Sequence, residues 1–151
     1  MSYFTAVLAR DGRRWSAHNL DVDTVADLGE LADELRDVAE ADDEPVLLLV
    51  EREDAWWGVV RVDGEEDPRV FVSDAAGSAA SPYAALLDVT AVDDEVESAV
   101  SGCVGDIDVL ADLGTSPERL QAICEEQLLP MDALAALAEG AGFAEVLDSL
   151  R

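Results

Sequence analysis

The sequence contains no lysine and a single histidine, and both shortages limit the chemistry that it can support. Without lysine the phosphate-binding pattern GxxxxGK[ST] cannot be completed, and none of the ten glycines falls in that pattern or in GxGxxG. A zinc deaminase needs His-x-Glu followed later by Pro-Cys-x-x-Cys, whereas Asn19 and Leu20 follow His18. We therefore expect neither nucleotide hydrolysis nor zinc-deaminase chemistry, and we assign no catalytic residue and no cofactor.

Positive charge is scarce. Nine arginines stand against 35 acidic residues, so the formal net charge is −26. A protein that binds nucleic acid or an anionic membrane needs a basic surface that displaces counterions from phosphates. We therefore expect no direct binding to nucleic acid or to membranes. The use of Arg alone is also typical of a GC-rich genome or a high-salt cytoplasm, so the acidity has a host-related explanation as well.

Long hydrophobic runs are absent too. Apolar runs such as residues 46–50 are far shorter than the roughly 20 residues of a membrane-spanning helix, and we expect a cytoplasmic protein. Cys103 and Cys124 form no CxxC pair, so we expect buried, reduced thiols and no disulfide. With 50% hydrophobic residues, the chain should nevertheless fold around a substantial core.

The N-terminal half has the pattern of strands around one helix. Apolar and aromatic runs bounded by turn residues predict strands at residues 3–10, 13–20, 46–50, 55–62 and 69–73. Apolar residues at three- and four-residue steps predict a helix over residues 24–41, with Thr24 as its N-cap. The run 46–50 lacks a polar alternate face, which predicts a central strand covered on both sides.

The C-terminal third is helical in pattern. Ser116, Pro117 and Glu118 supply a helix start, and further stripes begin at Met131 and Phe143. We predict an α+β fold: an antiparallel sheet of about five strands in the order β-β-α-β-β-β, one long packed helix, and a C-terminal cluster of short helices. The expected regions are a sheet domain at residues 1–74, a linker or irregular segment at 75–105, and a helical region at 106–151. Whether the helical region shares one core with the sheet is open.

Two groups of residues are candidates for a binding site. Trp56 and Trp57 are adjacent on a predicted strand and must point to opposite faces, so one of them is either an exposed partner anchor or covered by the C-terminal helices. Asp106, Asp108 and Asp112 are the closest approach to a metal constellation, although the glycine and terminal glutamate of an EF-hand are missing. With so many acids, a hydrated surface explains such spacings equally well.

Three blocks of sequence, residues 3–12, residues 56–62 together with 69–74, and residues 105–114, resemble the bacterial family of tRNA adenosine deaminase-associated proteins. The resemblance covers nearly the whole chain in order, and none of its motifs is catalytic. It implies association with the zinc enzyme that converts the wobble adenosine of a tRNA to inosine.

The resemblance leads to one functional hypothesis and leaves two alternatives. The hypothesis is a non-catalytic accessory protein that binds or regulates the deaminase, with Trp56, Trp57, Asp106, Asp108 and Asp112 as candidate partner-binding residues; its negative charge would complement a basic tRNA-binding face. The first alternative is a small-molecule or metal-binding protein that uses the three aspartates. The second is a self-associating structural protein, and the sequence does not determine the oligomeric state.

Overall fold

The computed structural model describes residues 3–11, 14–18, 25–38, 44–52, 56–63, 68–74, 104–105, 108–126 and 129–150. Within these residues the centre of the fold is a six-stranded antiparallel sheet with the order β2-β1-β3-β4-β5-β6. The strands are β1 (Tyr3–Asp11), β2 (Arg14–His18), β3 (Pro45–Arg52), β4 (Trp56–Asp63), β5 (Arg69–Val72) and β6 (Val104–Gly105).

The middle strands carry the apolar runs. β3 pairs with β1 on one side and with β4 on the other, and its residues from Pro45 to Glu51 are all buried. A strand with both faces covered needs no polar alternate positions, which explains the uninterrupted run Val46–Val50. The expected central position of this run is confirmed.

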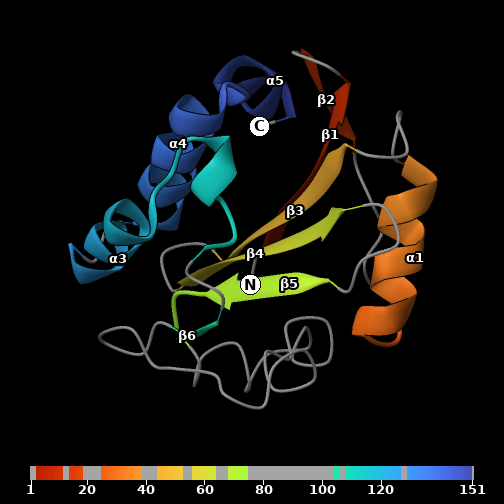
Figure 1. Ribbon diagram of the computed structural model, residues 1–151, viewed down its shortest axis with the longest axis horizontal. Helices are drawn as coiled ribbons and strands as arrows, with labels where there is room; N and C mark the ends of the chain where they lie inside the picture. The colour runs from red at the N-terminus through yellow and green to blue at the C-terminus, as the bar shows by residue number, and fades with distance from the viewer. Residues whose placement is uncertain are drawn as a thin grey trace.

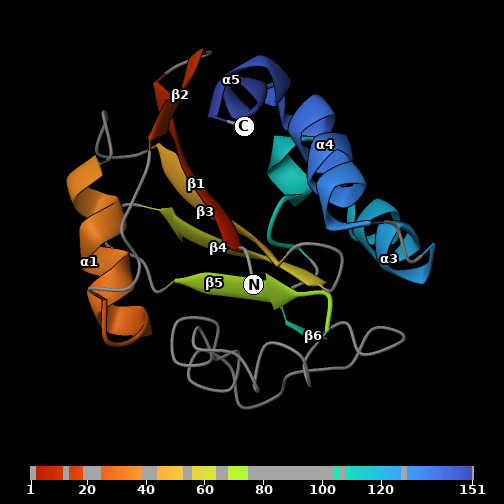
Figure 2. The same ribbon diagram turned by 180° about the vertical axis from the view of Figure 1, so that it is seen from behind.

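One face of the sheet is covered by α1 (Leu28–Val38), which lies to the right of the sheet in Figure 1 and to the left in Figure 2. Leu28, Leu31, Ala32 and Leu35 of α1 are buried. They belong to one hydrophobic cluster with side chains of β1, β3, β4 and β5, including Leu48 and Trp56. The 3.6-residue period of a helix thus supplies an apolar stripe to this face and leaves the outer face to water.

The helix begins later than expected. Residues 25–27 are not helical, and the Asp27 carboxylate accepts a hydrogen bond from the backbone N–H of Glu30 at 2.9 Å. This capping bond fixes the start of α1 at Leu28. Thr24, which the sequence favours as N-cap, lies outside the described residues.

The opposite face of the sheet is covered by the C-terminal region, which contains η3 (Ala111–Leu113), α3 (Pro117–Glu125), α4 (Pro130–Ala141) and α5 (Ala144–Leu150). The predicted start of α3 is confirmed: the Ser116 side chain accepts a hydrogen bond from the Arg119 N–H, and Pro117 is the first helical residue. Leu134 and Leu137 of α4 share a hydrophobic cluster with Leu47, Leu49 and other residues of the sheet.

The chain therefore forms three layers, with the sheet between α1 and the C-terminal helices, as Figures 1 and 2 show from opposite sides. The predicted α+β class and strand–helix order are confirmed, and the sheet has one strand more than expected. That strand, β6, falls at the end of the predicted linker, of which residues 75–103 lie outside the described residues. The division into three regions remains a prediction, although sheet and C-terminal helices contribute to one hydrophobic cluster.

Two further sequence expectations concern cysteine and membranes. Cys124 is buried in α3 and disulfide-bonded, so the expectation of reduced thiols was wrong; Cys103 lies outside the described residues. The spacing argument could not detect a bond between segments that only the fold brings together. Among the described residues, no helix has the length and apolar character needed to cross a membrane.

Candidate functional site

A buried arginine links the sheet to the C-terminal region. Arg61 lies on β4 between Val60 and Val62, whose side chains join the α1 side of the core, so alternation directs Arg61 towards the C-terminal helices. Only 4% of Arg61 is exposed. A cation at such a position must have partners, because an unpaired buried charge is very costly.

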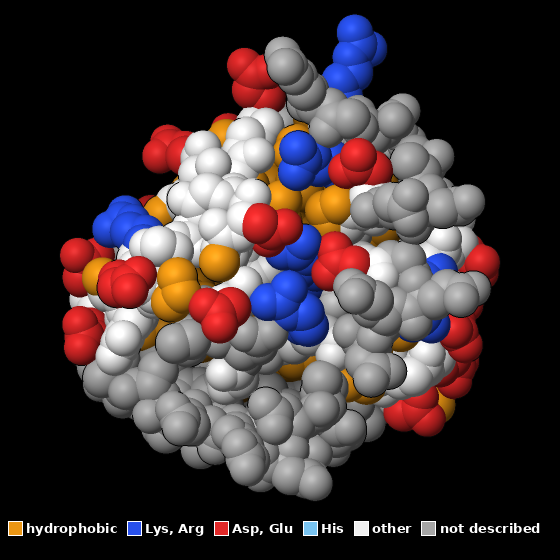
Figure 3. Space-filling model, viewed as in Figure 1, with side chains coloured by type: hydrophobic (Ala, Val, Ile, Leu, Met, Phe, Trp, Pro, Cys, Tyr) orange, Lys and Arg blue, Asp and Glu red, His pale blue; other side chains and the backbone are white. Residues whose placement is uncertain are grey.

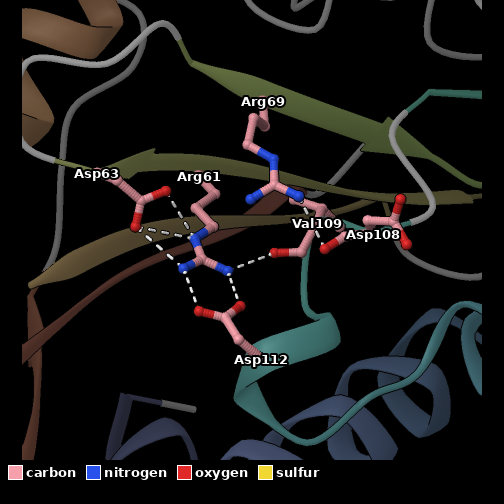
Figure 4. A network of polar contacts seen from close by, with 6 residues as sticks. All are labelled: Arg61, Asp63, Arg69, Asp108, Val109 and Asp112. Carbon is pink, nitrogen blue, oxygen red and sulfur yellow. Dashed lines mark hydrogen bonds and ion pairs between the residues drawn. The ribbon is translucent and has the colours of Figure 1, made fainter.

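Every N–H of the Arg61 guanidinium has an acceptor, as Figure 4 shows. Nε and Nη2 donate to the Asp63 carboxylate at 2.9 and 3.0 Å. Nη1 donates to the carbonyl oxygen of Val109 at 2.8 Å, and Nη1 and Nη2 each donate to one oxygen of the Asp112 carboxylate. This two-point contact with Asp112 is the fork geometry for which arginine is suited.

The network shifts the pKa values of Arg61 and Asp112. Burial would lower the pKa of Arg61, but hydrogen bonds to Asp112 and Asp63 and the charges of both carboxylates outweigh it and raise the pKa above its ordinary value. The Arg61 hydrogen bond lowers the pKa of Asp112, against a smaller opposing effect of burial. Arg61 and Asp112 are therefore both charged at neutral pH.

A second arginine holds the same segment. Arg69 on β5 is the cross-strand partner of Arg61, and its Nη2 donates to the backbone carbonyl of Asp108 at 2.8 Å. Its charge also helps to lower the pKa of Asp112. The two arginines thus attach the residues just before η3 to the sheet at two points.

The predicted metal constellation is not assembled within the described residues. Asp112 binds Arg61, and in Figure 4 the carboxylate of Asp108 points away from that of Asp112. Asp106 lies outside the described residues. In the part of the chain that the structure describes, no group of three or more His, Cys, Asp or Glu side chains could hold a metal ion.

Both candidate tryptophans are buried. Trp56 is 1% exposed and packs in the cluster under α1, while Trp57 is 3% exposed and belongs to the cluster under the C-terminal helices. The ring of Trp57 lies 5.7 Å from that of Phe71 on the neighbouring strand. The prediction that the two side chains point to opposite faces of the sheet is confirmed. Trp57 is covered by the C-terminal helices, which is one of the two alternatives that the sequence left open. Neither ring is presented at the surface, and a role of either in partner binding remains untested.

Acidic side chains instead dominate the outer faces of both helical layers. On α1 and at its start, the exposed acids are Asp27, Glu30, Asp33, Glu34 and Asp37. On the C-terminal helices they are Glu118, Glu125, Glu126, Asp132, Glu139, Glu145 and Asp148. The Arg36 side chain on α1 is paired with Asp33 at 3.0 Å, which leaves this face strongly negative.

Two large hydrophobic side chains are exposed within the described residues: Leu129 at 53% and Met131 at 55%. The sequence pattern placed Met131 in the apolar stripe of its helix, and this was wrong. The buried stripe of α4 starts one residue earlier, at Pro130, and continues through Ala133 and Leu134, so that Met131 falls beside it. Exposure of this pair distinguishes the α3–α4 junction from the acidic surface of α1.

Sequence reasoning did not single out Arg61, Asp63 or Leu129. Arg61 could have been found, because it interrupts a run of valines at a position that alternation assigns to the core. Its two distant partners could not be assigned to it, since Val109 and Asp112 are 48 and 51 positions away.

The described residues thus define an acidic α+β protein whose sheet lies between two helical layers, with an arginine-centred network that joins the sheet to the C-terminal region. A family model described as "Rv3753c-like tRNA adenosine deaminase-associated protein" matches residues 3–144, and the chain belongs to this family. The description names association with the deaminase, not deaminase activity. No curated protein and no solved structure matches the chain.

Proposed function

We propose that this chain is a non-catalytic accessory protein that binds a tRNA adenosine deaminase through its acidic surface and thereby regulates the enzyme's access to tRNA. The observation that carries the proposal is the acidic outer surface of both helical layers in a chain of a deaminase-associated family. Of the 151 residues only nine are basic, and Arg61, Arg36 and Arg10 are engaged with acids of the same chain.

The physical argument starts from the substrate of the partner. An enzyme that acts on tRNA must present a basic face to a polyanion, because neutralising phosphates supplies much of the binding free energy. A rigid acidic surface complements such a face and accelerates association with it. The same complementarity makes the protein and tRNA competitors for one surface.

The direct test is titration calorimetry of this protein with the deaminase from the same organism, at low and at physiological ionic strength. We expect a complex whose affinity decreases as salt is added, because exposed charges are screened. Absence of a complex at both ionic strengths would overturn the proposal.

A second experiment tests competition. We expect the deaminase's apparent affinity for tRNA to decrease as this protein is added, with a midpoint that follows the calorimetric Kd. Light scattering of the protein alone, at the concentrations of the titration, serves as the control for self-association. An unchanged tRNA affinity in the presence of a saturating complex would contradict regulation through tRNA access and leave the association itself in place.

A further inference from the structure

The junction between α3 and α4 presents apolar side chains that the fold does not use. Leu129 is the residue before α4 and Met131 the second residue of that helix, and they flank the buried Pro130. Pro130, Ala133 and Leu134 bury the inner side of the helix, so the core gains little from the two exposed side chains. Two exposed large apolar side chains this close in the chain can serve as anchors for a partner, and methionine is enriched in protein–protein interfaces.

Acidic residues surround this pair in the chain. Glu125 and Glu126 end α3, Asp132 follows Met131, and all three are exposed. No basic residue occurs between positions 125 and 132. Figure 3, in the orientation of Figure 1, shows hydrophobic side chains between acidic ones over the α3 side of the molecule. An exposed apolar pair with acidic neighbours in the chain is complementary to an apolar depression beside basic side chains.

We infer that Leu129 and Met131, with Glu125, Glu126 and Asp132 around them, form the docking surface for the deaminase. This inference rests on the function proposed above and selects one of the two acidic faces. The partner's chemistry follows from its substrate: a tRNA-binding face is basic, and the exposed hydrophobic pair requires an apolar depression within or beside it.

The other acidic face lacks the anchor. The exposed side chains at α1 are mainly carboxylates, and none of the exposed large hydrophobic side chains among the described residues lies on that helix. Charged rim contacts mainly affect association rate and salt dependence, whereas buried apolar anchors supply most of the affinity. α1 therefore contributes to the long-range field, and the docking surface supplies the contact.

The test is the double variant Leu129→Ser/Met131→Ser, titrated into the deaminase beside the unaltered protein. Serine is a favoured residue at the position before a helix, so the change at Leu129 is compatible with α4. An unchanged melting temperature and circular dichroism spectrum verify the fold. We expect the Kd to rise at least about tenfold, the effect of losing an interface anchor. The matched control, Glu30→Gln/Glu34→Gln on α1, should change the Kd by less than about threefold at physiological salt.

The outcomes separate this inference from the proposed function. If the unaltered protein binds and the Leu129→Ser/Met131→Ser variant binds equally well, the docking surface is wrong and the association stands. If the unaltered protein does not bind, both fail. If light scattering shows a dimer that the serine variant abolishes, while its affinity for the deaminase is unchanged, the surface joins copies of this chain and the inference is overturned.

Discussion

Arg61 of β4 and Arg69 of β5 lie directly opposite each other in the sheet, and both donate hydrogen bonds to the segment that leads into η3. Like charges at opposed strand positions are unfavourable unless acceptors compensate them. Here the Asp112 carboxylate accepts two bonds from Arg61, and the Asp108 carbonyl accepts one from Arg69. Docking of the C-terminal region on the sheet therefore helps to stabilise the pair.

The first prediction concerns the shape of the Arg61 side chain. Arg61→Lys keeps the charge but cannot contact Asp63, Val109 and Asp112 together, so we expect a loss of about 2 kcal/mol in the free energy of unfolding. Urea unfolding measures it. The control is Arg36→Lys, at a more exposed pair with Asp33, for which a change below about 0.5 kcal/mol is expected. Equal effects of the two substitutions would show that the network does not stabilise the fold.

The second prediction concerns acid pH. The Arg61 hydrogen bond lowers the pKa of Asp112 in the folded protein, so this contribution is present above the unfolded pKa of about 4 and is lost as the pH falls through the folded pKa. Asp112 is 65% exposed on its side chain, which limits the expected effect of Asp112→Asn at pH 7 to about 1 kcal/mol. The difference from the unaltered protein should shrink as the pH falls below about 4.

Chemical unfolding across the pH range, repeated in an Arg61→Met background, isolates the interaction in a double-mutant cycle. In that background the pH-dependent effect of Asp112→Asn should be much smaller, because only the weaker influences on the pKa of Asp112, such as the charge of Arg69, remain. A pH dependence that is equally large without Arg61 would assign the lowered pKa to another cause.

The third prediction concerns two glycines with positive φ. A Cβ at Gly114 would clash with the carbonyl oxygen of Gly140, whereas a Cβ at Gly142 would meet no atom within 4 Å. Gly142→Ala should cost about 1–2 kcal/mol from backbone strain alone. Gly114→Ala adds a clash with the end of α4, and we expect a further loss of at least about 1 kcal/mol. Thermal unfolding compares them, and equal costs would mean that the two segments separate easily.

The fourth prediction follows from the net charge of −26. Repulsion between the acidic faces destabilises the folded state, and salt screens it over a Debye length of about 8 Å at physiological ionic strength. We expect the melting temperature to rise with added sodium chloride. A melting temperature indifferent to salt would show that the charges are already dispersed or paired.

Much of the architecture could be predicted because its determinants are local. The run Val46–Val50, the stripe of α1 and the Ser116–Pro117 start of α3 each have a pattern that an isolated segment displays. The resemblance to the deaminase-associated family, stated from three blocks of sequence, is confirmed by the match over residues 3–144.

The features that the sequence did not predict depend mainly on contacts between distant segments of the chain. β6 has two residues, too few for any periodicity, and exists through its pairing with β5. The bond between Arg61 and Asp112 spans 51 positions. The exposure of Met131 depends on whether the buried stripe of α4 begins at Pro130 or at Met131. Both residues are apolar, so the periodicity of the sequence does not distinguish the two positions.

The pairing of β5 with β6 has a consequence for the length of the chain. Val72 and Val104 are direct partners, so the two ends of the chain segment between them lie side by side in the sheet. Bringing the two ends of a chain segment together becomes only about 0.6 kcal/mol more costly with each doubling of its length. Insertions and deletions between these two valines should therefore accumulate among relatives with little effect on the three layers, and a reporter peptide inserted there should leave the α3–α4 junction intact.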